Sequence, residues 1–293
     1  MGFASVSSPR VELARAKVNL ALHITGRRPD GFHLLESFVA FPQIGDRVAL
    51  EAAETLELRL EGPFARDLDG EADDNLVLRA VRGFAEQSGG AVPKVRLTLT
   101  KRLPVSSGIG GGSSDAATAL RLLEDFTGTY LSADRIHQLA LSLGADVPVC
   151  MMPEPQIMRG IGDELSPGPA LPSCGIILVN PRRSVSTPEV FKALTQKDNP
   201  AMPPVPEKFG GLSDFADFLA NCRNDLQDAA VGLCPQIGDV LTALRGDTRI
   251  GFVRMSGSGA TCFGLCEMKD AMDVERTLRE AHPDWWIASG PLS

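Results

Sequence analysis

Residues 94–126 read KVRLTLTKRLPVSSGIGGGSSDAATALRLLEDF, and this stretch decides how the centre of the chain folds. Its first eight residues alternate apolar and polar side chains, which is the period of a strand with one buried face. Its last part carries apolar side chains at helical spacing, at Ala116, Ala119, Leu120, Leu123 and Phe126. Between the two patterns lie four glycines in the five residues 108–112. The sequence therefore predicts a strand, a glycine-rich loop and a helix in direct succession.

A loop of this kind suits the phosphate groups of a ligand. Glycines let backbone N–H groups turn inward around an anion, and they leave no Cβ atom to block its approach. We expect Ser113 to be the N-cap of the helix, whose first turn adds unpaired N–H groups and a favourable dipole. The hydroxyls of Ser113 and Ser114 could add donors or a ligand for a phosphate-bound Mg²⁺. The residues expected to hold phosphate are Pro104, Val105, Ser106, Ser107, Gly108, Ile109, Gly110, Gly111, Gly112, Ser113 and Ser114.

Two common phosphate motifs do not fit this loop. No lysine follows the glycines, as a Walker A loop requires. The dinucleotide fingerprint requires a third glycine or alanine where this chain has Ser113. A flexible linker is a further alternative, but the glycines directly adjoin two well-patterned elements without a polar spacer.

The rest of the chain predicts a mixture of strands and helices. Residues 11–60 resemble strands joined by turns, and a helix is expected after Asp74 with Leu76, Ala80 and Phe84 on one face. Further helices are expected at 132–144, between 212 and 245, and at 270–281. A buried strand at 175–180, a glycine-rich hairpin near 251–266 and a short final strand complete the pattern. Because no parallel βαβ rhythm is visible, we predict an α+β fold with domains at 1–168 and 169–293.

The composition limits the kinds of partner. The 293 residues carry a net charge of −8, which disfavours binding to nucleic acid or to an anionic membrane. Basic pairs occur at 27–28, 101–102 and 182–183. Such pairs are usually solvated surface charge, although an acidic protein could use them to hold a phosphorylated small molecule. No apolar stretch approaches the length of a membrane span.

The cysteines and the N-terminal residues favour a cytoplasmic protein. Six cysteines are present without a CxxC spacing, and the four histidines show no metal-ligand spacing. Most of the cysteines fall in apolar stretches, where a free thiol behaves as a small hydrophobic group. The N-terminal residues lack the charged and apolar regions of a signal peptide.

Four stretches of the chain resemble one superfamily of kinases. The loop PVSSGIGGGSSDAA is similar to the signature of the GHMP kinases, which include galactokinase, homoserine kinase and mevalonate kinase. The segments ARAKVNLALHITGRRPDGFH (14–33), GADVPVCM (144–151) and MSGSGATCFGL (255–265) are similar to the branch that acts on cytidine-diphosphate-linked methylerythritol. These segments spread over nearly the whole chain.

The resemblance implies a fold and a reaction. The fold would be a two-domain GHMP kinase, with an N-terminal domain like the second domain of ribosomal protein S5 and a ferredoxin-like C-terminal domain. ATP, as co-substrate and with Mg²⁺, would phosphorylate the 2-hydroxyl of the cytidine-diphosphate-linked substrate in the non-mevalonate route to isoprenoid precursors.

The resemblance also implies roles for individual residues. Lys17 and Asp146 match the catalytic pair, and Asn75 matches a residue near the adenine or ribose of ATP. Asn19 and Thr187 match residues near the methylerythritol end. The residues that match the cytosine site are Phe32, where tyrosine is commoner, His33 and Phe191.

Several alternatives remain open from the sequence. The acceptor could be another small molecule, such as homoserine or mevalonate, or the chain could bind nucleotide without catalysis. Asp146 could remove the hydroxyl proton or only position the hydroxyl. Phe191 could be a core residue, and the residues 256–259 could form a tight hairpin or contact a ligand. The protein ligands of Mg²⁺ and the oligomeric state are not predicted.

Overall fold

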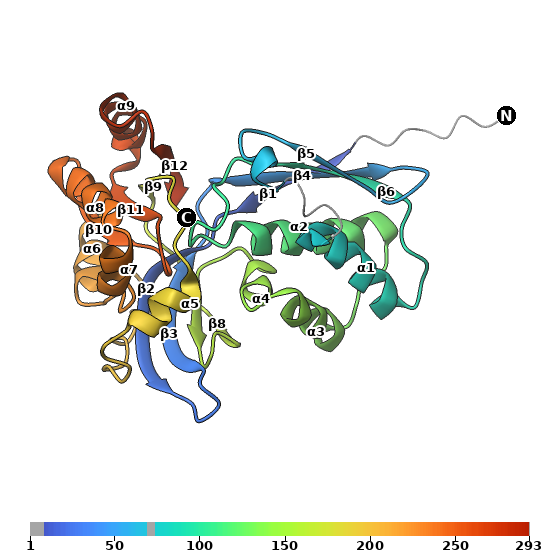
Figure 1. The fold of residues 1–293 in the computed structure, drawn as a ribbon, viewed down its shortest axis with the longest axis horizontal. Helices are drawn as coiled ribbons and strands as arrows, with labels where there is room; N and C mark the ends of the chain where they lie inside the picture. The colour runs from blue at the N-terminus through green and yellow to red at the C-terminus, as the bar shows by residue number, and fades with distance from the viewer. Residues whose placement is uncertain (1–8, 69–73, 293) are drawn as a thin grey trace. The chain divides into compact units, whose positions relative to one another are not determined.

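The computed structural model describes residues 9–68 and 74–292, and it shows a mixed α+β protein (Figure 1). The chain forms two compact units, each assembled from several segments. The first unit contains the described residues up to Arg15 together with Gly45–Val105 and Gly111–Met152. The second contains Ala16–Ile44, Ser106–Gly110 and the described residues from Pro153 onward. The predicted division at residue 168 is a division along the sequence, and it stays a prediction.

The first unit is built on a four-stranded sheet. Its strand order is β1 (Arg10–Arg15), β4 (Gly45–Ala52), β6 (Val95–Thr100) and β5 (Glu57–Glu61), with β5 and β6 parallel and the other pairs antiparallel. Helix α2 (Gly111–Thr127) packs along the sheet (Figure 1). Helices α1 (Leu76–Ser88), α3 (Ala133–Leu143) and the short α4 (Val147–Cys150) contact α2, and a 3-10 turn spans Ala65–Leu68.

Local sequence signals set these elements. In β6 the side chains of Val95, Leu97 and Leu99 are buried, as strict alternation requires of a strand with one covered face. Helix α1 begins at the cap Asn75 and ends at Gly89, which has the left-handed backbone that favours glycine. These features confirm the predicted strand before the glycine loop and the predicted helix after Asp74.

The second unit contains two antiparallel sheets. One has the order β2 (Val18–Arg27), β3 (His33–Ala40), β7 (Gln156–Arg159) and β8 (Glu164–Pro167). The other has the order β10 (Ile250–Met255), β11 (Cys262–Cys266), β9 (Cys174–Asn180) and β12 (Trp286–Leu292).

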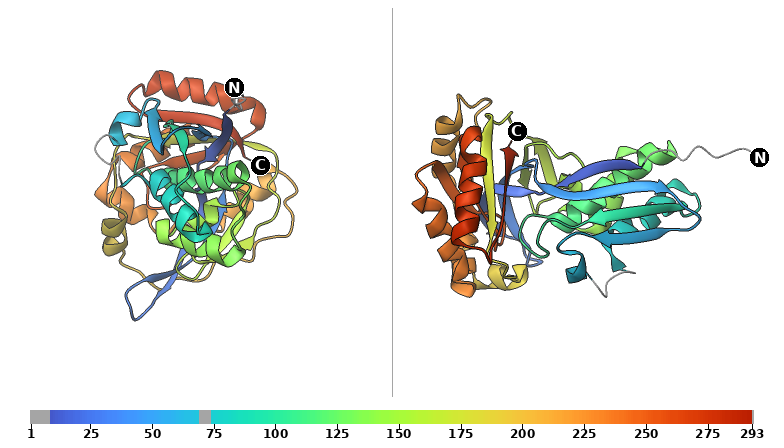
Figure 2. Two further views of the ribbon diagram at one scale, coloured as in Figure 1. Left: turned by 90° about the vertical axis from the view of Figure 1, so that its right-hand side faces the viewer. Right: turned by 90° about the horizontal axis from the view of Figure 1, so that it is seen from above.

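Helices cover the second of these sheets. Helices α8 (Gln236–Gly246) and α9 (Ala271–Ala281) lie along one of its faces (Figure 2). Together with α5 (Thr187–Ala193) and α7 (Gln227–Leu233), they supply apolar side chains to a core that also contains Ile177 and Val179 of β9. The remaining elements are α6 (Leu212–Ala220) and a 3-10 turn at Met268–Asp270.

Two differences from the sequence expectations concern the middle of the chain. The hairpin of β7 and β8 was not predicted, because each strand has only four residues and the surrounding stretch is rich in proline and glycine. Helix α2 begins at Gly111, so Ser113 lies inside the helix and the prediction that it is the N-cap was wrong. Throughout the two described ranges, no helix is long and apolar enough to cross a membrane.

Candidate functional site

The glycine-rich loop joins β6 to α2, as predicted. Because α2 begins at Gly111, its first unpaired N–H groups belong to residues 111–114. Gly112 in this turn is exposed, and its lack of a side chain leaves the backbone open to a ligand. Ser114 is buried, and its hydroxyl donates to the carbonyl oxygen of Arg15 at 2.7 Å. The turn therefore offers an anion mainly backbone N–H groups, the Ser113 hydroxyl and the positive end of a 17-residue helix.

Residues 106–110 of the loop pack within the second unit, against the hairpin at 256–259. A Cβ atom on Gly108 would lie 2.4 Å from the carbonyl oxygen of Gly259, so only glycine fits there. The Ser256 hydroxyl donates to the carbonyl oxygen of Gly108 at 3.2 Å, and the N–H of Thr261 donates to that of Ser107 at 3.2 Å. The second glycine hairpin therefore shapes the phosphate loop.

Lys17 lies directly beside this part of the loop. Its side chain is only 4% exposed, and its backbone N–H donates to the carbonyl oxygen of Ile109 at 2.9 Å. Gly110 has a φ of +62° and faces the aliphatic part of the Lys17 side chain. The sequence-predicted lysine and the predicted loop are therefore brought together by the fold of the second unit.

Asp146 occupies the N-cap position of α4 but does not act as a cap. Its side chain makes no capping hydrogen bond, and the residue is half-buried. Asn75, in contrast, uses its side-chain oxygen to accept the N–H of Val77 at 2.9 Å and so caps α1. Its role near adenine or ribose stays a prediction.

A buried group of three charges holds the two ends of the phosphate loop, and sequence reasoning missed it. The Lys101 ammonium donates to Asp115 at 2.8 Å and also to Asp46. The second carboxylate oxygen of Asp46 accepts the N–H of Leu103 at 2.9 Å. Because Lys101 and Leu103 precede the loop and Asp115 lies in the first turns of α2, the group joins the entry and the exit of the loop.

Burial governs the protonation of this charged group. Burial raises the pKa of Asp115 to about 7, against the opposing effect of Lys101. Burial alone would lower the pKa of Lys101, but Asp115 and Asp46 raise it above its ordinary value. One carboxylate oxygen of Asp115 is buried without a hydrogen-bond partner. The ammonium is therefore charged, and Asp115 is the member that gains a proton most readily.

A sequence signal for Lys101 was present. In the alternating strand, position 101 is in phase with the buried Val95, Leu97 and Leu99. A lysine on the buried face needs a carboxylate partner, because an unpaired buried charge is costly. Asp115 lies in the glycine-loop motif, but the motif alone does not reveal its pairing with Lys101.

The residues matched to the methylerythritol end lie in the second unit, around the glycine hairpin. The Asn19 amide donates to Ser37 at 2.7 Å, and the Asn19 backbone N–H donates to the Ser256 hydroxyl at 3.0 Å. The Thr187 hydroxyl lies 2.7 Å from the Ser258 hydroxyl. Both predicted residues therefore contact a serine of the hairpin at 256–259, for which the sequence left a ligand contact open.

Two of the three residues matched to cytosine are in ring contact. His33 and Phe191 stack with centroids 5.1 Å apart and planes 29° apart, whereas Phe32 is 60% exposed. Burial, Arg27 and Lys197 lower the pKa of His33. Its Nδ1 atom is buried and has no hydrogen-bond partner. The pair thus presents a neutral imidazole with one unsatisfied polar atom.

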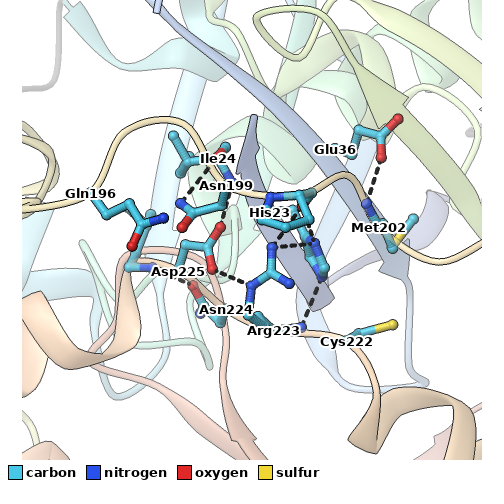
Figure 3. A network of polar contacts seen from close by, with 12 residues as sticks. His23, Ile24, Glu36, Gln196, Asn199, Met202, Cys222, Arg223, Asn224 and Asp225 are labelled. Carbon is cyan, nitrogen blue, oxygen red and sulfur yellow. Dashed lines mark hydrogen bonds and ion pairs between the residues drawn. The ribbon is translucent and has the colours of Figure 1, made fainter. Parts of the chain in front are cut away.

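A polar network ties the connection after α5 to strand β2, which also carries Asn19 (Figure 3). The Nε2 atom of His23 accepts the backbone N–H of Arg223 at 2.8 Å, which requires a neutral ring. The backbone N–H of Asn199 donates to the carbonyl oxygen of Ile24 at 3.0 Å. Burial lowers the pKa of His23, consistent with the neutral ring.

Comparison with known protein families gives the class of the protein. Residues 75–154 match the family model for the GHMP kinases N terminal domain, and residues 207–285 match the model for the GHMP kinases C terminal domain. Together the matches span more than half of the chain and both units. They define an ATP-dependent kinase of the GHMP class, as the sequence resemblance implied.

Similar proteins identify the family within the GHMP class to which this chain belongs. A 4-diphosphocytidyl-2-C-methyl-D-erythritol kinase of Ruegeria pomeroyi is 51% identical over 280 residues, covering 94% of this chain and 97% of the relative. A kinase of the same name from Paracoccus denitrificans is 48% identical, covering 97% of each chain. A crystal structure of 4-(cytidine 5'-diphospho)-2C-methyl-D-erythritol kinase is 32% identical, with a TM-score of 0.79 and coverage of 97% and 99%. The chain belongs to the family of 4-diphosphocytidyl-2-C-methyl-D-erythritol kinases.

Proposed function

We propose that this chain transfers the γ-phosphoryl group of ATP to the 2-hydroxyl of 4-diphosphocytidyl-2-C-methyl-D-erythritol. The observation that supports this most directly is the buried Lys17 packed beside the glycine loop. A buried ammonium next to a loop of backbone donors suits the negative charge of a phosphoryl group in transfer. The identity of the acceptor is inferred from the relatives, which are named 4-diphosphocytidyl-2-C-methyl-D-erythritol kinases.

The roles proposed for the catalytic residues follow from the needs of phosphoryl transfer. The acceptor oxygen forms a bond to the γ-phosphorus while the bond to the ADP oxygen breaks, and the hydroxyl proton must leave. We assign the acceptance of this proton to Asp146. We assign the offset of negative charge on the γ-phosphate to Lys17. The loop 104–114 holds the phosphates, which it can do mainly through its backbone N–H groups.

The described residues offer few side chains that could coordinate the Mg²⁺ ion that accompanies ATP. Across the described ranges 9–68 and 74–292, no three His, Cys, Asp or Glu side chains group as a metal site. The hydroxyl oxygen of Ser113 would suit a magnesium ion that is bound mainly by phosphate and water, whereas Ser114 is buried and its hydroxyl donates to Arg15. When bound, Mg²⁺ would neutralise charge on the β- and γ-phosphates.

The acceptor is assigned to the second unit. His33 and Phe191 would recognise cytosine, by a hydrogen bond from the imidazole and by aromatic stacking, with Phe32 beside them. Asn19 and Thr187 would position the methylerythritol end. The unsatisfied Nδ1 atom of His33 supports this assignment, because a buried polar atom without a partner is costly unless a ligand completes it. The cytoplasmic location stays a proposal from composition.

The function is tested by ADP release with a panel of acceptors. The panel contains the cytidine-diphosphate-linked substrate, free methylerythritol, homoserine and mevalonate. We expect turnover with the first compound alone at physiological concentration. Turnover with homoserine or mevalonate instead would overturn the acceptor, and ATP binding without turnover of any acceptor would indicate a nucleotide-binding protein without catalysis.

A further inference from the structure

The connection between β9 and α5 carries two adjacent arginines in an otherwise acidic chain. Arg182 and Arg183 are both exposed, and the net charge of the chain is −8. The proposed roles of the catalytic, ATP and acceptor residues leave this basic pair unused. The pair lies shortly before α5, the helix that carries two of the residues assigned to the acceptor.

The backbone of Arg182 is held in an unusual conformation by buried polar groups. Its φ is +56°, which side chains other than glycine rarely adopt. The buried side-chain oxygen of Asn180 accepts the Arg182 N–H at 2.8 Å. The Asn180 amide in turn donates to the Thr261 hydroxyl at 2.9 Å. Strained residues that their surroundings hold in place are concentrated at ligand sites.

The same connection leads directly into the helix assigned to the acceptor. Thr187 is the first residue of α5, and its hydroxyl contacts Ser258 of the glycine hairpin. Phe191 lies one turn further along α5 and stacks on His33. The arginines thus precede by four and five residues a side chain proposed to contact the polyol.

We propose that Arg182 and Arg183 form a subsite for the diphosphate group of the acceptor. Guanidinium groups bind phosphoryl oxygens through paired, charge-assisted hydrogen bonds. The inference rests on the proposed function, because that function supplies an acceptor with a diphosphate between its cytidine and polyol ends. The triphosphate of ATP has the same chemistry, so the experiment must separate the two nucleotides.

The variants remove charge without adding strain. Arg182→Gly keeps the positive φ, since glycine adopts it readily, and keeps the N–H that donates to Asn180. Arg183→Gln keeps a polar side chain of similar length. Lys192→Gln is the matched control, because Lys192 is an exposed cation on the same helix, α5. Circular dichroism and thermal unfolding verify that each variant is folded.

Binding of CDP and of cytidine is measured by calorimetry, beside KM for the acceptor and for ATP. In the double variant Arg182→Gly/Arg183→Gln we expect the affinity for CDP to fall by about tenfold or more, because charge-assisted hydrogen bonds to its diphosphate are lost. The affinity for cytidine and the KM of ATP should not change. The acceptor KM should rise in parallel, and Lys192→Gln should behave as wild type.

Three outcomes would overturn the inference. Unchanged CDP affinity in the double variant would exclude a diphosphate subsite here. A rise in the KM of ATP alone would assign the arginines to the donor. An equal loss in Lys192→Gln would show a general charge effect. The activity of the wild-type enzyme separates this inference from the proposed function. If the wild type phosphorylates the cytidine-diphosphate-linked acceptor, the proposed function is retained in each of these three cases. If it does not, both proposals are wrong.

Discussion

The backbone of Gly110 lies against the side chain of Lys17. A Cβ atom on Gly110 would be 3.1 Å from the Cβ atom of Lys17 and 3.6 Å from its Cε atom. Few real Cβ contacts are as close as the first of these distances, so any side chain at position 110 must displace the lysine. The absence of a side chain at Gly110 therefore leaves room for the aliphatic part of the Lys17 side chain.

Replacing Gly110 by alanine should damage catalysis through this contact. Alanine at a positive φ costs about 1–2 kcal/mol of stability, and the displaced Lys17 should lower kcat/KM by roughly tenfold or more. Gly128→Ala is the control, since Gly128 has a φ of +67° with nothing within 4 Å of an added Cβ atom. It should show the loss of stability alone. Equal kinetics for the two variants would show that the Lys17 contact does not matter.

The proposed base gives a second prediction. Asp146→Asn should lower kcat by at least ~10²-fold and leave the KM of ATP nearly unchanged, because an amide cannot accept the proton. Lys17→Met should also lower kcat, through lost charge stabilisation. Asp134→Asn, at the exposed start of α3, is the control for loss of an acidic side chain near a helix N-terminus. Steady-state kinetics decide the matter, and near-wild-type turnover of Asp146→Asn would remove its assignment.

The buried charged group gives a prediction for stability. Lys101→Met leaves Asp46 and Asp115 buried without their cation, so it should destabilise the fold by about 3–5 kcal/mol. Asp115→Asn should cost less, because its pKa is raised and the neutral amide resembles the protonated acid. Urea unfolding at constant pH measures both. A smaller loss for Lys101→Met than for Asp115→Asn would contradict the pairing seen in the structure.

The same group makes stability depend on pH. Burial raises the pKa of Asp115 from 3.8 to about 7, so between these values the folded protein holds a proton that the unfolded chain has released. The contribution of Asp115 to the free energy of unfolding must then fall as the pH rises through this range. Asp115→Asn should remove that part of the slope. The free energy of unfolding is measured with urea at several pH values across this range. If its dependence on pH is the same in Asp115→Asn as in the wild type, Asp115 does not titrate in this range.

Local features of the site were predictable from the sequence, and long-range contacts were not. The alternation at 94–101 and the glycines at 108–112 predict the strand, the loop and the helix, because these signals act over neighbouring residues. The bond between Lys101 and Asp46 joins residues 55 positions apart, so no local pattern reports it. The predicted start of α2 was three residues too late, because several adjacent glycines and serines can each begin a helix.

The acceptor residues show the same limit. Family motifs pointed to His33 and Phe191 separately, but only the fold shows that their rings stack. The sequence could not show that Phe32, beside His33, is largely exposed. Nor could it show that Asn19 and Thr187 each contact a serine of the hairpin at 256–259.

The stacked pair of His33 and Phe191 gives the final prediction. Base stacking is worth roughly 1–3 kcal/mol by alanine substitution, and a lost hydrogen bond to a buried group costs about 1–3 kcal/mol. Phe191→Ala and His33→Ala should therefore each lower kcat/KM for the acceptor by roughly 5- to 150-fold. The KM of ATP should stay constant in both. Burial, Arg27 and Lys197 hold the pKa of His33 below its ordinary 6.5, so acceptor KM should be flat above neutral pH and rise only in acid.

The control for this prediction is a second stacked histidine in the same unit. His282 stacks on Trp285 with centroids 3.8 Å apart, and neither residue has a proposed role in catalysis. His282→Ala removes a comparable ring contact, so it should leave the acceptor KM unchanged even if it lowers stability. Equal losses in His282→Ala and His33→Ala would show that the kinetic effect reports stability. If His33→Ala and Phe191→Ala weaken ATP binding as much as they weaken acceptor binding, the role of the pair is structural. If His33→Ala and Phe191→Ala weaken the binding of the acceptor alone, the pair recognises cytosine. Cytosine recognition would then explain why His33 is neutral and half-buried and why its Nδ1 atom has no partner in the protein.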